Sequence, residues 1–137
     1  MRKIRKAQLI SAALKARKKA CAPYSRFRVG AALLTHQGKI ISGANVESAS
    51  YGLTCCAERI ALFTALTSGE KNFTAIAIVA RVDGGGMPCG ACRQLLVEYA
   101  PSATVLVADS AKPKTIKEFT VRELLPGAFL NFPQASA

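Results

Sequence analysis

The segment Pro88-Cys89-Gly90-Ala91-Cys92 constrains this chain more than any other feature of its sequence. Pro88 opens a predicted helix after a glycine-rich loop, so the two cysteines lie three positions apart in its first turn. Residues with that spacing share one helix face, and their Cβ atoms lie about 5–6 Å apart. Two thiolates on one tetrahedral zinc ion lie somewhat under about 4 Å apart. Cys89 and Cys92 can therefore bind a single zinc ion without strain.

A second segment, Cys56-Ala57-Glu58, begins another predicted helix and supplies a candidate third ligand, Cys56. Three protein ligands leave the fourth position of one Zn²⁺ per subunit to water, which is typical of a catalytic site. Glu58 lies two residues from Cys56 and can reach that water, first as a general base and then as a general acid. Alone, Glu58 would be interpreted as a first-turn glutamate stabilised by the helix dipole. Beside three cysteines, it is our candidate catalytic residue.

Three thiolates on one Zn²⁺ carry a net negative charge, which weakens the ion as a Lewis acid. Groups that withdraw charge from the sulfurs are therefore expected around the site. Arg59 follows Glu58 directly and is our candidate donor of hydrogen bonds to the thiolates, and Arg93, next to Cys92, is a weaker one. The remaining cysteines, Cys21 and Cys55, are interpreted as small buried hydrophobic residues.

Composition and charge narrow the class of protein. The chain has 137 residues, half of them hydrophobic, which predicts one domain over residues 1–137 and argues against disorder. No apolar run is long enough for a membrane-spanning helix, so no membrane partner is expected. The net charge of +11 suggests nucleic acid, but the basic residues cluster in positions 1–28, which lack acidic residues. An odd number of cysteines with no convincing secretion signal favours a reducing compartment, hence a cytoplasmic location.

Periodicity and turn residues predict alternating helices and strands. The spacing of apolar residues and the positions of proline and glycine give helices, strands and connecting loops without an internal repeat. The resulting fold class is an α/β domain whose sheet lies between helices. The predicted helices cover residues 3–20, 56–66 and 88–99, the predicted strands cover 29–35, 39–43, 73–82 and 104–108, and residues 117–125 are a short strand with a helical turn.

Several motifs together resemble the cytidine deaminase family, in its small homotetrameric form. Cysteine-x-glutamate followed by Pro-Cys-x-x-Cys is the motif of the zinc deaminases. The resemblance extends from about residue 7 to residue 129 and implies a three-layer α/β/α fold with a mixed five-stranded sheet. The segments that carry it are 22–27, 45–54, 56–59, 88–94 and 123–129.

The resemblance implies an activity and a role for individual residues. Zinc is expected on Cys56, Cys89 and Cys92, and the reaction is hydrolytic deamination of cytidine and 2'-deoxycytidine, with Glu58 moving protons. Hydroxide would attack C4 of the base while Glu58 protonates N3, and ammonia would leave. The residues implied to bind the substrate are Phe27 against the base, Ala57 through its backbone amide, Asn45 and Glu47 on the ribose, and Ala49, Tyr51 and Phe129 from a neighbouring subunit of a homotetramer.

Four alternatives share part of this pattern. A deaminase of nucleic acid would explain the basic N-terminal region, but Asn45 and Glu47 suit a free nucleoside, so nucleic acid is not the expected partner. A thioredoxin-like redox pair at Cys89 and Cys92 leaves Cys56 and Glu58 unexplained. A structural zinc module would require a fourth protein ligand, which is not evident. A deaminase of a cytosine-bearing antibiotic is the nearest enzymatic alternative.

Overall fold

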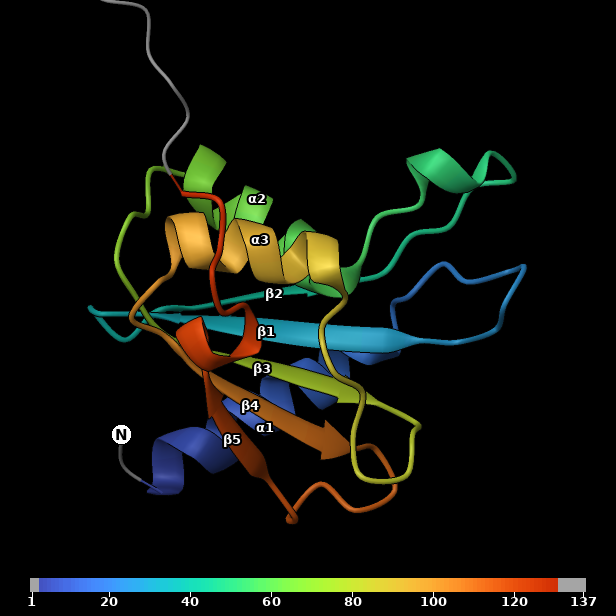
Figure 1. Cartoon of the computed structure of the whole chain (residues 1–137). Coiled ribbons are helices and arrows are strands. Elements are labelled where there is room, and N and C mark those ends of the chain that lie inside the picture. The colour runs from blue at the N-terminus through green and yellow to red at the C-terminus, as the bar shows by residue number, and fades with distance from the viewer. Residues whose placement is uncertain (1–2, 131–137) are drawn as a thin grey trace, which may run out of the picture.

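A five-stranded mixed sheet forms the centre of the computed structural model, which describes residues 3–130 (Figure 1). The strand order is β2-β1-β3-β4-β5; β3 and β4 run parallel, and every other neighbouring pair is antiparallel. The strands are β1 Val29–Thr35, β2 Ile40–Ala44, β3 Phe73–Ala80, β4 Thr104–Asp109 and β5 Lys117–Thr120. The helices are α1 Lys3–Arg17, α2 Ala57–Thr67 and α3 Gly90–Tyr99, with short 3-10 helices η1 Tyr51–Leu53 and η2 Arg122–Leu124.

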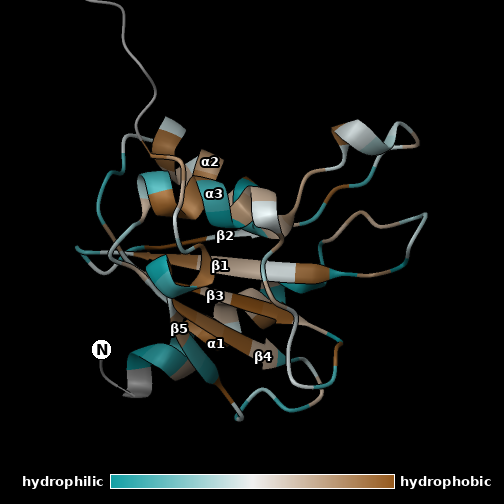
Figure 2. Cartoon of the chain, in the orientation of Figure 1, coloured by the Kyte–Doolittle hydropathy of each residue, from teal (hydrophilic) through white to brown (hydrophobic). Residues whose placement is uncertain are grey.

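Helices cover both faces of the sheet: α2 and α3 lie on one face and α1 on the other (Figure 1). Alternate residues of β3 point to opposite faces, so Ile76 and Ile78 pack beneath α2 and α3, whereas Ala77 and Val79 pack against α1. Figure 2 shows apolar residues concentrated along the central strands, while the edge strand β5 is largely hydrophilic. The three layers and the mixed five-stranded sheet confirm the predicted fold class. A single domain over residues 1–137 stays a prediction.

Two glycines let helices contact the sheet backbone directly. A Cβ atom on Gly30 of β1 would lie 1.9 Å from the carbonyl oxygen of Ala13 in α1. A Cβ atom on Gly43 of β2 would lie 2.6 Å from the backbone nitrogen of Ala61 in α2. Only glycine permits such close approach. Gly43 therefore fixes how closely α2, and the site residues at its N-terminal end, approach the sheet.

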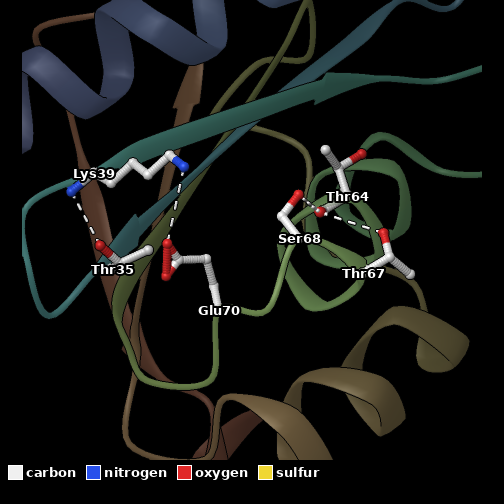
Figure 3. A network of polar contacts seen from close by, with 6 residues as sticks. All are labelled: Thr35, Lys39, Thr64, Thr67, Ser68 and Glu70. Carbon is white, nitrogen blue, oxygen red and sulfur yellow. Dashed lines mark hydrogen bonds and ion pairs between the residues drawn. The ribbon is translucent and has the colours of Figure 1, made fainter.

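Hydroxyl groups satisfy the carbonyl groups at the other end of α2. Ser68 Oγ donates to the Thr64 carbonyl over 2.7 Å, and Thr67 Oγ1 lies 3.4 Å from the same oxygen (Figure 3). Lys39 Nζ and Glu70 Oε1, 3.9 Å apart, connect the β1–β2 hairpin to the segment after α2 (Figure 3). The hydroxyl groups add to the bond that the Ser68 N–H donates to the Thr64 carbonyl over 3.1 Å, and so reinforce the end of the helix.

The observed boundaries differ from the predicted ones mainly after α1. The predicted helix over 3–20 ends at Arg17, before Pro23, because the following backbone pairs with a distant segment. Cys21 donates its N–H to the Asn45 carbonyl over 2.9 Å and accepts from the Glu47 N–H over 2.9 Å. Cys21 is exposed, so its interpretation as a buried hydrophobic residue was wrong.

The connections after α1 and after β2 project together from one end of the sheet (Figure 1). They comprise residues 18–28 and 45–56, and both lead into the candidate site. Among the described residues, no helix is long and apolar enough to cross a membrane.

Candidate active site and metal centre

Three cysteine sulfurs meet where two helices begin. Cys56 is the residue before α2, Cys89 is the residue before α3, and Cys92 lies in the first turn of α3. The Sγ atoms of Cys56 and Cys89 are 3.8 Å apart, those of Cys89 and Cys92 are 3.5 Å apart, and all three lie within 4.8 Å of one another. Tetrahedral zinc–thiolate geometry requires sulfurs separated by just under about 4 Å. The three side chains therefore fit one zinc ion.

The environment of Cys56 favours the thiolate form that binds metals. Hydrogen bonding from Cys92 lowers the pKa of the Cys56 thiol to about 5, with Arg59 acting in the same direction against the effect of burial. The N-terminal ends of α2 and α3 also face the sulfurs, and the positive end of a helix dipole stabilises negative charge. Arg59 and the two helix ends thus stabilise negative charge on the sulfur cluster.

Arg59, in the first turn of α2, directs its guanidinium group toward the sulfur cluster. Its Nη2 lies 3.4 Å from Cys56 Sγ and 3.4 Å from the carbonyl oxygen of Thr54. Its Nε is buried without a hydrogen-bond partner among the described residues, and the Cys56 sulfur raises the pKa of the guanidinium group. A partly buried cation beside thiolates offsets part of their negative charge. Arg59 thus lies within hydrogen-bond distance of one candidate ligand, and its role at a zinc site stays a prediction.

Arg93 lies on α3 but makes different contacts. Its Nε donates to the Pro88 carbonyl over 2.7 Å, and its Nη1 donates to the Leu124 carbonyl over 3.0 Å. Within residues 3–130, its hydrogen bonds therefore go to backbone oxygens, not to a sulfur. Arg93 holds the chain just before Cys89 against the segment that follows β5.

Glu58 is the buried carboxylate of the site. It lies in the first turn of α2 and is 5% exposed. Burial raises its pKa to about 7. A carboxyl group with a pKa close to neutral can both accept and release a proton at that pH, which is the requirement for a general acid–base catalyst.

A small cavity connects the sulfur cluster to the predicted substrate-binding residues. Its volume is about 270 Å³, just below the range of roughly 300–1,000 Å³ typical of ligand pockets. The cavity brings together seven of the predicted site residues: Phe27, Asn45, Glu47, Cys56, Ala57, Glu58 and Cys89. A cavity of this size suits one small molecule held next to the metal centre and the buried carboxylate.

The family profile for the cytidine and deoxycytidylate deaminase zinc-binding region matches residues 3–108, most of the chain. The chain belongs to the cytidine and deoxycytidylate deaminase family. This confirms the predicted family and its zinc-binding type, and the cluster of Cys56, Cys89 and Cys92 is consistent with the zinc site.

Named relatives and solved structures agree with this family. The chain is 53% identical over 121 residues to the cytidine deaminase of Halalkalibacterium halodurans, covering 88% of this chain and 91% of the relative. It is 46% identical over 122 residues to the cytidine deaminase of Sporosarcina psychrophila, covering 89% of each. A crystal structure of cytidine deaminase from Burkholderia pseudomallei superposes with a TM-score of 0.87 at 47% identity, covering 94% of this chain and all of that chain.

Asn45 and Glu47 of this deaminase family member lie beside each other at the cavity wall. Asn45 Nδ2 donates to the Phe27 carbonyl over 2.8 Å, and its Oδ1 accepts from the Val29 N–H over 2.8 Å. Glu47 accepts from the N–H groups of Tyr24 and Ser25 over 3.0 and 3.1 Å. The hydrogen bonds from Ser25 lower the pKa of the Glu47 carboxyl group. Glu47 therefore offers a negative charge to the cavity at neutral pH.

Three predicted residues lie outside the cavity of this deaminase chain. Tyr51, in η1, is 83% exposed, and Ala49 in the same connection is exposed as well. Phe129 is 62% exposed, and its carbonyl oxygen accepts from Gln94 Nε2 over 2.8 Å. The predicted role of Ala49, Tyr51 and Phe129 in a neighbouring subunit stays a prediction.

Sequence reasoning missed several residues of the deaminase cavity. Thr54 and Met87 lie on its wall, as do the strand residues Val29, Ile78 and Ala80. Thr54 entered only as part of the segment 45–54 and Met87 was not singled out, because neither carries a ligating or titratable group. Their nearness to Cys56 and Cys89 in the sequence is the signal that could have placed them.

Proposed function

We propose that this chain is a cytidine deaminase that hydrolyses cytidine and 2'-deoxycytidine to uridine and 2'-deoxyuridine with release of ammonia, as in pyrimidine salvage. The single observation that carries this proposal is one small cavity lined by two of the three clustered cysteines, Cys56 and Cys89, and by the buried Glu58. The relatives named cytidine deaminase at 46–53% identity support the same substrate.

Cys56, Cys89 and Cys92 would hold the zinc ion. When bound, zinc supplies Lewis-acid chemistry that makes water a nucleophile near neutral pH. Arg59 contributes by donating to Cys56 Sγ, which moderates the negative charge of the ligand set. Arg93 contributes by holding the backbone before Cys89 in place. The ligands thus come from two helix ends, and each end is fixed by an arginine.

Glu58 performs the proton transfers in this mechanism. Its carboxylate takes a proton from the attacking water and delivers it to N3 of the cytosine ring as the C4–O bond forms. Glu58 then takes the proton of the new C4 hydroxyl and delivers it to the amino group. The C4–N bond breaks, ammonia leaves and the C4 carbonyl of uridine forms. A pKa near 7 allows Glu58 to alternate between these two states without a large free-energy cost in either direction.

The remaining cavity residues select the substrate. Phe27 packs against the cytosine ring, and the backbone amide of Ala57 donates to the pyrimidine carbonyl, because the first amides of a helix lack intrahelical acceptors. Asn45 and Glu47 hydrogen-bond a sugar hydroxyl. A nucleoside that has lost one hydroxyl can still satisfy part of this set, which explains why both ribo- and deoxyribonucleosides are proposed substrates.

A homotetramer would complete the site. Ala49, Tyr51 and Phe129 would each reach the cavity of a neighbouring subunit, which agrees with their exposure in this chain. We also propose a cytoplasmic location, because all five cysteines are free thiols and a reducing compartment preserves them.

Conversion of cytidine to uridine, followed by ultraviolet absorbance with zinc measured on the same sample, tests this function. We expect turnover of cytidine and deoxycytidine by protein that carries stoichiometric zinc. Cytosine within single-stranded DNA or RNA should not react, since the cavity of about 270 Å³ accommodates a single small molecule. Turnover confined to nucleic acid, or no turnover by zinc-loaded protein, would contradict the proposal.

A further inference from the structure

Ser25 lies at the centre of a group of hydrogen bonds beside the cavity. Its hydroxyl group donates to Glu47 Oε2 in a short contact. The hydroxyl oxygen of Ser25 also accepts from the Phe27 N–H over 2.9 Å. Its backbone N–H donates to Glu47 Oε1 over 3.1 Å. One small side chain therefore contacts both the carboxylate of Glu47 and the backbone of Phe27.

The backbone around Ser25 adopts an uncommon conformation to make these contacts. Arg26 has φ of +60°, the left-handed region that residues other than glycine rarely occupy. Its N–H donates to the Ala22 carbonyl over 3.0 Å, closing a tight turn. This turn brings the Phe27 N–H back onto the Ser25 hydroxyl. Such a conformation carries a free-energy cost, so other interactions must maintain it.

Asn45 fixes the same segment from the other side. Its side chain contacts the Phe27 carbonyl and the Val29 N–H, each over 2.8 Å. Phe27 is therefore held through its N–H by Ser25 and through its carbonyl by Asn45. The three residues proposed to bind the nucleoside belong to one hydrogen-bonded unit, and Ser25 is the member that connects Glu47 to Phe27.

Ser25 itself does not line the substrate cavity in the part of the chain that the structure describes. It lines an adjoining depression together with Tyr24, Ser48 and Tyr51, and Glu47 and Thr54 separate the two hollows because each lines both. Ser25 thus contacts the Glu47 carboxylate from the adjoining depression. The other side of Glu47 lines the cavity, where the substrate would bind.

We propose that Ser25 is a positioning residue for nucleoside recognition, which fixes the Glu47 carboxylate and the Phe27 backbone in one arrangement before the sugar binds. This proposal rests on the function proposed above. A carboxylate has about four acceptor sites. Tyr24 N–H, Ser25 N–H and the Ser25 hydroxyl use three of them. The arrangement leaves room for a single donor from the cavity, which is what one sugar hydroxyl provides.

Two further properties follow from this arrangement. Hydrogen bonds from Ser25 keep the pKa of Glu47 below its ordinary value, so the carboxylate stays a pure acceptor. A fixed acceptor also loses less conformational freedom when the ligand binds, and this pre-organisation raises affinity without a new contact to the ligand. Loss of Ser25 should therefore weaken substrate binding while the chemistry at Glu58 proceeds.

Steady-state kinetics of Ser25→Ala, Ser25→Thr and a control variant test the proposal. The control is Ser11→Ala, an exposed serine on α1, on the opposite face of the sheet from α2. For Ser25→Ala we expect KM for cytidine to rise about tenfold or more, the loss typical of a hydrogen bond to a charged group, with kcat and zinc content nearly unchanged. Ser25→Thr retains the hydroxyl and should restore most of the affinity, and Ser11→Ala should match the unaltered chain.

A double-mutant cycle distinguishes positioning from a general structural role. In a Glu47→Gln background, Ser25→Ala should change KM less than it does in the unaltered chain, because the carboxylate is gone and only the contact with the Phe27 N–H remains to be lost. An equal effect in both backgrounds, or an unchanged KM for Ser25→Ala alone, would overturn the proposal. A fall in kcat and zinc content without a change in KM would overturn it too.

A measurement that needs no turnover separates this inference from the proposed function. Carbon-13 NMR titration of the Glu47 carboxyl group should show a higher pKa in Ser25→Ala than in the unaltered chain. If the unaltered, zinc-loaded chain fails to deaminate cytidine, the function is wrong, and the titration still decides whether Ser25 controls Glu47. An identical Glu47 titration in both proteins would count against Ser25.

Discussion

The Sγ atoms of Cys56 and Cys89 lie 3.8 Å apart although 33 positions separate the two residues in the sequence. Each cysteine directly precedes a helix, and both helices lie on the same face of the sheet (Figure 1). The packing of α2 and α3 on that face therefore creates the metal centre. Metal binding and folding are expected to be coupled in such an arrangement.

Replacement of one ligand should demonstrate this coupling. We expect Cys89→Ala to lose nearly all bound zinc and to unfold at a lower temperature, because two sulfurs bind zinc far more weakly than three. Elemental analysis and thermal unfolding measure both effects. The exposed Cys21 lies outside the cluster, so Cys21→Ala should keep its zinc and serves as the control. A stable, zinc-replete Cys89→Ala protein would exclude Cys89 as a ligand.

The sequence contained enough information for the metal centre but less for its surroundings. Ligand spacing is local: Cys89 and Cys92 are three positions apart at the start of a helix, and this alone limits their separation. That Cys56 lies close to these two cysteines was predicted from the motif, not from periodicity. Helix ends were less predictable, since α1 stops at Arg17 where the Cys21 backbone pairs with residues 45–47, an interaction between distant segments.

Replacement of Glu58 by glutamine should separate catalysis from metal binding. Glu58→Gln keeps the size of the buried side chain but cannot accept or release a proton. We expect kcat to fall by about 10²–10⁴-fold, the usual contribution of general acid–base catalysis, with zinc content unchanged. Glu98→Gln, at an exposed position of α3, is the matched control and should retain full activity. If Glu58→Gln keeps near-normal kcat, another group must move the proton.

A methyl group at position 43 should disturb the site through the fold. The Cβ of Gly43→Ala would lie 2.6 Å from Ala61 N and 3.0 Å from the Ala57 carbonyl oxygen, so α2 must move away from β2. We expect a loss of about 1–3 kcal/mol in the free energy of unfolding, as for other overpacked positions. Chemical denaturation measures this loss. A Cβ at Gly90 meets no atom within 4 Å, so Gly90→Ala should be tolerated. Equal stabilities of the two variants would contradict the tight packing of α2.

The polar network beside the cavity was the least predictable part. Asn45 and Glu47 were identified only by resemblance, since either residue in a loop is usually a turn-capping group. Their hydrogen bonds reach Phe27 and Ser25 across about twenty residues of sequence, as the chain folds back alongside itself. No local pattern encodes such a pairing, so the role of Ser25 required the structure.

The pH dependence of stability should reveal the lowered pKa of Glu47. A carboxyl group whose pKa is lower in the folded than in the unfolded state stabilises the fold above its ordinary pKa of 4.5, and this contribution is lost as the pH falls through the folded-state value. The difference in unfolding free energy between the unaltered chain and Glu47→Gln should therefore be constant near neutral pH and shrink in acid. Loss of zinc in acid affects both chains, so it cancels in the difference between their unfolding free energies. A difference that grows toward low pH would reverse the sign of the shift, and Glu98→Gln controls for the change in net charge.

Tyr51 in η1 is proposed to complete the cavity of a neighbouring subunit. Tyr51 is 83% exposed in this chain, so its ring is accessible to a neighbouring subunit. If Tyr51 completes the cavity of a neighbour, Tyr51→Ala should lower activity while Glu58 of the same chain remains intact. Glu58→Gln should likewise be inactive with Tyr51 intact.

Co-expression of these two variants provides a test that a single-chain site cannot pass. Mixed tetramers contain some cavities with Glu58 from one subunit and Tyr51 from its neighbour, so part of the activity should return although each variant alone has little. The mixture of Glu58→Gln with Cys89→Ala is the control. Glu58 and Cys89 line the cavity of the same chain, so every cavity in this mixture lacks either its carboxylate or one sulfur, although Tyr51 is intact in both chains. If activity does not return in the first mixture, or returns equally in both mixtures, each chain forms its site alone.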